Sequence, residues 1–274
     1  ALVVAEDAAR RVVELQHPKE RLVKALGYQG VALRRLKRYA EAAEALQKCV
    51  DLSPEEYQNW SNLGIAYTLG GDLEKAEHHF GEGAKRAGVT KDAWRAAIWR
   101  NYASLMLFLG KGDALRYLDN ALQCNDKDLT SRILRAKAWL DLPTARDPVN
   151  ALVAAQFADH AGNFREPKAK RVLALAYLAN GKPAQAGVEA RAALELQDLP
   201  VINHLILAVV ESRAGRFDDA AAQLATAEQT WPAELREPGT FVANADTGDL
   251  WMDAADELLR LRNDAQQALI AAGR

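Results

Sequence analysis

A pair of short helical patterns separated by a turn recurs along this chain at intervals of 34 residues, as between the units that start at Val23 and Tyr57. In the stretch WSNLGIAYTLGGDLEKAEHHF (60–80), one amphipathic pattern is broken at Gly70 and Gly71 and a second follows at once. Glycine readily takes the left-handed backbone conformation that ends a helix. The period therefore predicts a series of helical hairpins, each of which buries its apolar face against the next.

The residue types at fixed positions in this stretch have steric reasons. Gly64 has no side chain and allows the partner helix to approach closely, and Trp60 and Phe80 are large enough to fill the space between the helices. The full pattern, W-x2-L-G-x2-Y followed by A-x3-F, resembles the tetratricopeptide repeat, a helix-turn-helix unit of about 34 residues. The resemblance implies an all-α fold, an α-solenoid in which hairpins stack into a right-handed superhelix.

The same pattern divides the chain into one predicted solenoid, 1–274. Regular units are expected at 23–56, 57–90, 167–200 and 201–234, with irregular units at 91–128 and 129–166. In the third unit the second helix comes four residues late, which predicts a first helix lengthened through NYASLMLFLG by about one turn. Pro143 should end the first helix of the fourth unit and Pro148 should begin the second.

Both ends of the sequence depart from the regular pattern. Residues 1–22 are expected to form a helix of a partial unit, with Ala8, Val12 and Leu15 in second-helix positions. This is either a lone packing helix or the sign of a fragment of a longer protein, and the fragment is favoured because solenoids need complete, capped ends. Residues 235–274 are expected to form a C-terminal cap, with one long helix between Asp249 as N-cap and Gly273. No strand-like run is expected.

Composition excludes several classes of function. The formal net charge is −2, which gives no basic surface for nucleic acid or an anionic membrane, and no apolar run is long enough to span a bilayer. The two cysteines, Cys49 and Cys124, cannot make a disulfide framework or a zinc site, so a reducing, cytoplasmic location is expected. Cys49 falls in a small-residue packing position.

Candidate chemistry is sparse. Glu74 and His78 lie one turn apart on a helix, but no third ligand completes a metal site. The glycine-rich GEGAKRAG (81–88) lacks the strand and the G-K-[ST] ending of a phosphate loop. We therefore expect no enzyme activity, cofactor or metal.

In the family that the chain resembles, the first helix of each unit lines a concave surface that binds peptides. Carrying these positions over gives Lys24, Gly27 and Val31 in the first unit. The residues expected to line this groove are Arg34, Gln58, Asn62, Ile65, Arg95, Trp99, Tyr102, Lys168 and Arg171.

Arg95, Trp99 and Tyr102 resemble an interaction hot spot, because aromatic and arginine side chains often anchor partners. Alternatively, the lengthened helix turns Trp99 into the core. Asn62 matches one residue of the set with which some family members hold a C-terminal carboxylate. The other positions of this carboxylate-binding set carry Gly27, Val31, Asp92 and Ala96 in this chain, so binding of a C-terminal carboxylate is not expected.

The predicted function is a protein-interaction scaffold that binds a peptide or partner domain on its concave surface. Two alternatives remain. The C-terminal stretch is similar to the tails of large bacterial proteins that join a serine/threonine kinase to helical repeats, which implies a regulatory or substrate-recruiting region, although no kinase motif lies in this chain. The other alternative is a self-assembling scaffold that associates through its solenoid ends.

Overall fold

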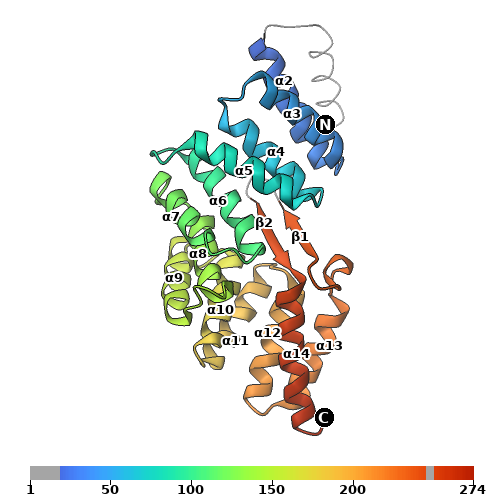
Figure 1. The fold of residues 1–274 in the computed structure, drawn as a ribbon. Coiled ribbons are helices and arrows are strands. Elements are labelled where there is room, and N and C mark those ends of the chain that lie inside the picture. Colours follow the sequence, from blue (N-terminus) through green and yellow to red (C-terminus); the bar gives the residue numbers. More distant parts are fainter. Residues whose placement is uncertain (1–18, 245–249) are drawn as a thin grey trace. The chain divides into compact units, whose positions relative to one another are not determined.

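The computed structural model describes residues 19–244 and 250–274, which form helical hairpins, a two-stranded ribbon and a final helix (Figure 1). The hairpins pair α2 (Lys19–Arg35) with α3 (Tyr39–Leu52), α4 (Tyr57–Leu69) with α5 (Leu73–Ala87), α6 (Ala93–Phe108) with α7 (Ala114–Cys124), α8 (Leu129–Asp141) with α9 (Pro148–Ala161), α10 (Pro167–Ala179) with α11 (Pro183–Glu195), and α12 (Pro200–Arg213) with α13 (Phe217–Gln229). The short helix η1 (Ala233–Leu235), strands β1 (Phe241–Asn244) and β2 (Trp251–Ala254) and helix α14 (Ala255–Ala271) follow. The expected α-solenoid of helical hairpins is confirmed.

The described residues fall into two compact units. The N-terminal unit contains α2–α7 together with residues 243–244 and 250–251. The C-terminal unit contains residues 129–242, which include α8–α13, together with residues 110–112 and 252–274. In each unit, the second helix of a hairpin packs on the first helix of the next, as α3 does on α4 and α11 on α12. A single domain over 1–274 remains a prediction.

Within the hairpins, close helix contact depends on glycine at the predicted position. A Cβ atom built on Gly64 would lie only 2.8 Å from the ring of Phe80, whose side chain is fully buried in the facing helix α5. One repeat earlier, a Cβ on Gly30 would lie 2.5 Å from Cγ of Leu46 in α3. Gly71 has φ of +84°, which places it in the left-handed region between α4 and α5. The steric reasons inferred from the sequence are therefore confirmed.

Cys49 occupies a fully buried position in α3. Its Sγ lies 3.4 Å from the carbonyl oxygen of Val23, to which it can donate a hydrogen bond, and burial raises the pKa of the thiol to about 12. Such a thiol stays protonated at neutral pH and is a poor nucleophile. The packing role expected for Cys49 is consistent with this environment.

The irregular hairpins follow from their sequences. α6 has 16 residues and α4 has 13, so the first helix of the third hairpin is indeed lengthened. α8 ends at Asp141, two residues before Pro143, and Pro148 is the first residue of α9, where its missing N–H is not needed. The Asp147 side chain accepts hydrogen bonds from the N–H groups of Val149 and Asn150 and so caps α9.

The expected long C-terminal helix is present as α14, but it starts later than predicted, and the expectation of no strands was wrong. Trp251–Ala254 forms β2, which pairs with β1, and the helix begins only at Ala255. Leu250, Trp251 and Met252 are buried one after another, a pattern of an extended segment covered on both faces rather than of an amphipathic helix. The predicted N-cap, Asp249, and the predicted partial-unit residues Ala8, Val12 and Leu15 lie outside the described residues.

Candidate functional site

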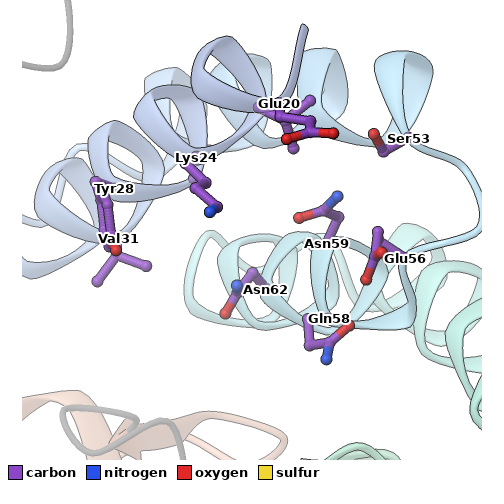
Figure 2. Close-up of a pocket in the computed structure, with 11 residues that line it drawn as sticks. Glu20, Lys24, Tyr28, Val31, Ser53, Glu56, Gln58, Asn59 and Asn62 are labelled. Carbon is purple, nitrogen blue, oxygen red and sulfur yellow. The ribbon is translucent and has the colours of Figure 1, made fainter.

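The N-terminal unit has an open cavity of about 420 Å³ between the first helices of its first two hairpins, α2 and α4 (Figure 2). These two helices are in contact with each other, and the cavity follows their shared face. The cavity, called here the α2–α4 groove, is lined by Glu20, Val23, Lys24, Gly27, Tyr28, Val31, Ser53, Glu56, Gln58, Asn59 and Asn62.

The α2 side of the groove is largely apolar. Val23, Gly27 and Val31 are spaced four residues apart and therefore lie along one face of the helix. A Cβ atom on Gly27 would meet no other atom within 4 Å, so the glycine leaves open space in this face. The side chain of Tyr28 borders the groove and is 70% exposed. This side therefore offers aliphatic surface and one accessible aromatic ring.

The α4 side of the groove carries carboxamide side chains, Gln58, Asn59 and Asn62. Lys24 on α2 and Asn59 on α4 extend from opposite helices into the space between them (Figure 2). Within the described part of the chain, Gln58 Oε1 and Asn59 Nδ2 are buried and have no hydrogen-bond partner. Carboxamides both donate and accept hydrogen bonds, which are the two functions that a peptide backbone requires.

The predicted groove residues divide into two groups. Gln58 and Asn62 line the α2–α4 groove, as do Lys24, Gly27 and Val31. Arg34 and Ile65, by contrast, are only 6% and 1% exposed and do not line it.

Sequence reasoning missed Tyr28, which is among the most exposed large hydrophobic residues of the described chain. Tyr28 could have been predicted from its position four residues after Lys24, because residues four apart are neighbours on the same face of a helix. Asn59 was missed because it directly follows the predicted position Gln58, and residues one apart on a helix point in different directions (Figure 2).

The suggested hot spot does not form an exposed cluster. Trp99 is 9% exposed, its indole N–H donates a hydrogen bond of 2.8 Å to the carbonyl of Gly88, and its ring lies 5.6 Å from that of Tyr117 in α7. Tyr102 stacks on Tyr117 with ring centroids 4.4 Å apart, and burial together with a hydrogen bond to Tyr117 raises the pKa of Tyr102 above its usual value. Arg95 lies over the ring of Tyr57 at 5.2 Å. These contacts favour the core interpretation of Trp99.

In the C-terminal unit, the predicted groove face is covered. Arg171 is 2% exposed and forms ion pairs with Asp198 at 3.1 Å and Asp253 at 2.9 Å, while Lys168 is half-buried. Positions on the same face of α10 and α12 are buried as well, including Leu175. Arg171 is therefore inaccessible to an added partner in this arrangement.

The covering element is the chain's own C-terminal segment, defined here as residues 252–271. α14 packs mainly on α12 and less on α13, and its Glu257 reaches Lys137 in α8. A cap that continued the stack would instead pack mainly on α13, as α12 does on α11. The segment therefore lies along the first helices of the C-terminal hairpins rather than beyond the last one, which corrects the expected placement of the cap.

Among residues 19–244 and 250–274, no group of three or more histidine, cysteine, aspartate or glutamate side chains is placed to hold a metal ion. In the same residues, no helix has the length and apolar character needed to traverse a bilayer.

Comparison with known proteins places the fold. The family profile described as tetratricopeptide repeat matches residues 23–56, which are α2, α3 and the turn that follows. No curated protein sequence matches the chain. The profile matches one hairpin, and the other hairpins resemble it in their helix-turn-helix structure.

Solved structures with this fold cover most of the chain. A tetratricopeptide repeat protein from Parabacteroides merdae ATCC 43184 is 16% identical with a TM-score of 0.68, over 96% of this chain and 92% of that one. A chain of the APC/C hetero-tetramer Cut9-Hcn1 is 14% identical with a TM-score of 0.70, over 95% of this chain and 46% of that one. YrrB, described as a repeat protein with an unusual peptide-binding site, is 13% identical with a TM-score of 0.52, over 70% of this chain and 93% of that one. At these identities the similarity establishes the fold alone.

Proposed function

Because the chain is a helical-repeat protein with the tetratricopeptide-repeat fold, we propose that it is a non-catalytic interaction scaffold whose α2–α4 groove binds a peptide of a partner protein. The observation that carries the proposal is the contrast between the two units. In the N-terminal unit the face formed by α2 and α4 is open, whereas the C-terminal segment covers the face formed by the first helices of the C-terminal unit.

The chemistry of the two groove sides fits an extended peptide. Alternate side chains of an extended strand point to opposite sides, so one set can pack on Val23, Val31 and the Tyr28 ring. The backbone N–H and C=O groups between them then face the carboxamides of Asn59 and Asn62. Lys24 lies between these two sides and can pair with an acidic side chain of the peptide.

The peptide-binding description of YrrB supports the proposal only by showing that this fold can hold a peptide. Binding would require little change of shape, since the groove exists without a ligand and its walls are regular helices. A preformed groove lowers the ordering penalty of association, which allows even a short segment to bind with useful affinity.

The test is a selection from a random peptide library against the full chain, followed by measurement of the affinity of the enriched peptides by fluorescence anisotropy. The variants Tyr28→Ala and Asn62→Ala should each weaken binding, and together by about tenfold or more, because rim aromatics and backbone-directed amides are removed. The matched control is Val188→Ala, which removes an exposed apolar side chain from α11, 60% exposed and far from this groove in sequence.

Two results would contradict the proposal. One is an enriched peptide whose affinity is the same for the groove variants and for the Val188 control. The other is a library selection in which the wild-type chain enriches no sequence, although circular dichroism shows that it is folded.

A further inference from the structure

The inner face of the C-terminal unit carries two buried cations. Lys137 in α8 is 8% exposed and Arg171 in α10 is 2% exposed. Each is paired with a carboxylate from its own neighbourhood, Lys137 with Asp141 at 2.7 Å and Arg171 with Asp198 at 3.1 Å. We call this surface of α8, α10 and α12 the inner wall.

Each cation also receives a second carboxylate, and both come from the C-terminal segment. Glu257 lies 2.6 Å from Lys137, and Asp253 lies 2.9 Å from Arg171. The two carboxylates are four residues apart in the segment, Asp253 in the extended strand β2 and Glu257 in the first turn of α14, and they reach cations on two successive first helices, α10 and α8. Burial alone would lower the pKa of Lys137, but Asp141 and Glu257 raise it above its usual value, so the lysine remains charged.

The rest of the segment is an amphipathic helix. Leu258, Leu261, Ala265 and Leu269 recur every three or four residues and are at most 8% exposed, whereas residues such as Asp256 are exposed. An apolar stripe laid against a wall of first helices is a common mode of helix recognition. The segment therefore has the chemistry of a ligand, with an acidic pair that sets its register and an apolar stripe that provides contact area.

The segment does not fill the wall completely. A cavity of about 120 Å³ remains beside Leu175, Val209 and Leu261. Complementary packing at the centre of an interface usually leaves no such space, so a bound helix with a different apolar stripe could match or exceed the contacts of the chain's own segment.

We infer that the inner wall of the C-terminal unit is a binding site for acidic segments that begin extended and continue as an amphipathic helix. A partner segment with one carboxylate just before its helix and another in the first helical turn, followed by an apolar stripe, exchanges with the chain's own residues 252–271. The inner wall selects acidic ligands because Lys137 and Arg171 each take a second carboxylate from the bound segment, and a basic helix would place like charges together. This site is separate from the α2–α4 groove and does not depend on peptide binding there.

The probe is a fluorescent peptide of residues 252–271, titrated against the full chain by anisotropy. In the wild-type chain the tethered segment competes at an effective concentration of roughly millimolar, so the free peptide should bind weakly. The chain variant Asp253→Asn with Glu257→Gln weakens the tethered segment, and it should bind the native peptide about tenfold more tightly than the wild type does. A peptide that carries these same two substitutions should not bind.

The matched control is a peptide with Asp256→Asn, which removes one charge from an exposed position of the helix and should bind like the native peptide. A peptide with Glu257→Gln alone has the same change of charge and should bind more weakly. Circular dichroism checks that the chain variant is folded. If it is not, Asp253→Asn alone serves, because Asp253 is only half-buried and Arg171 keeps Asp198.

The inference is overturned if the native peptide binds neither chain, or if the native peptide and its Asp253→Asn, Glu257→Gln form bind equally. It is also overturned if the chain variant forms a dimer that excess peptide does not dissociate, since a second copy would then be the occupant.

Discussion

Replacing Gly64 with alanine should destabilise the N-terminal unit, whereas the same replacement at Gly27 should stabilise it. Both glycines lie in the middle of helices, α4 and α2 respectively, so alanine improves the helix propensity by about 1 kcal/mol at either position. The two positions differ only in what the new methyl group meets.

At Gly64 the added Cβ would lie 2.8 Å from Cδ1 and Cε1 of Phe80 and 2.9 Å from its Cγ. These atoms belong to a fully buried ring that has no open space to move into, and overpacking of this kind typically costs about 1–3 kcal/mol. After subtraction of the propensity gain, a net loss of about 1 kcal/mol is expected. At Gly27 nothing lies within 4 Å of the new Cβ, so a gain of up to about 1 kcal/mol remains.

The assay is urea unfolding monitored by circular dichroism, with hydrogen exchange of the α4 and α5 amides to localise the effect. A difference of about 2 kcal/mol between the variants corresponds to midpoints separated by about 1 M urea, for a slope near 2 kcal/mol/M. Equal midpoints, or a Gly64→Ala chain more stable than Gly27→Ala, would refute the steric argument for close helix approach.

Three further predictions concern buried groups. Burial, followed by the charges of His78 and Lys75, lowers the pKa of His79 from 6.5 to about 4. Between these pH values the unfolded chain binds more protons than the folded chain, so stability should fall as the pH drops from 6.5 to 4. In urea titrations at both pH values, His79→Phe should remove roughly 2 kcal/mol of that loss, and an unchanged pH profile would count against the prediction. Asp128→Asn should lower the free energy of unfolding by about 3 kcal/mol, because it removes the carboxylate that lies 2.5 Å from the buried guanidinium of Arg100. A loss of stability no larger than that caused by Asp126→Asn, at an exposed position, would argue against this. Trp99→Ala should lower the free energy of unfolding by about 3 kcal/mol or more without affecting peptide affinity, whereas Trp94→Ala, which removes a 71% exposed ring from the same helix, should change the stability little. A Trp99 variant that is defective in peptide binding alone would support the hot-spot interpretation instead.

The helical hairpins could be predicted because their determinants are local and repeated. Gly64 and Phe80 lie within one unit and face each other across one turn, and Gly30 and Leu46 repeat this pairing 34 residues earlier. A periodic pattern reports on such contacts directly, since each helix meets only its neighbours.

The candidate site was only partly predictable, because residue spacing gives the face of a helix but not its surroundings. Lys24, Asn62 and their neighbours line the α2–α4 groove as the frame suggested, yet Arg34 and Ile65 on the same nominal face are buried. At Trp99, the spacing could not show that the aromatic rings of α6 would pack on Tyr117 of α7.

The covering of the C-terminal unit could not be predicted from a repeat pattern at all. The amphipathic character of the final helix was visible in the sequence, but amphipathicity does not identify the surface that receives the apolar stripe. That choice depends on Lys137 and Arg171, which look like ordinary helix charges until the structure places Glu257 and Asp253 beside them.

The hydrogen bond between Lys137 and Glu257 joins residues 120 positions apart. The helical hairpins, by contrast, join residues that are close together in the sequence. Closing so long a loop slows the final step of folding, and on the ribosome it must wait until Glu257 has been synthesised. Until then Lys137 and Arg171 each have only the carboxylate of their own hairpins, Asp141 and Asp198, and the apolar positions that α14 later covers are bare. This is the interval in which a chaperone or a preformed partner would meet that surface without competition from the segment.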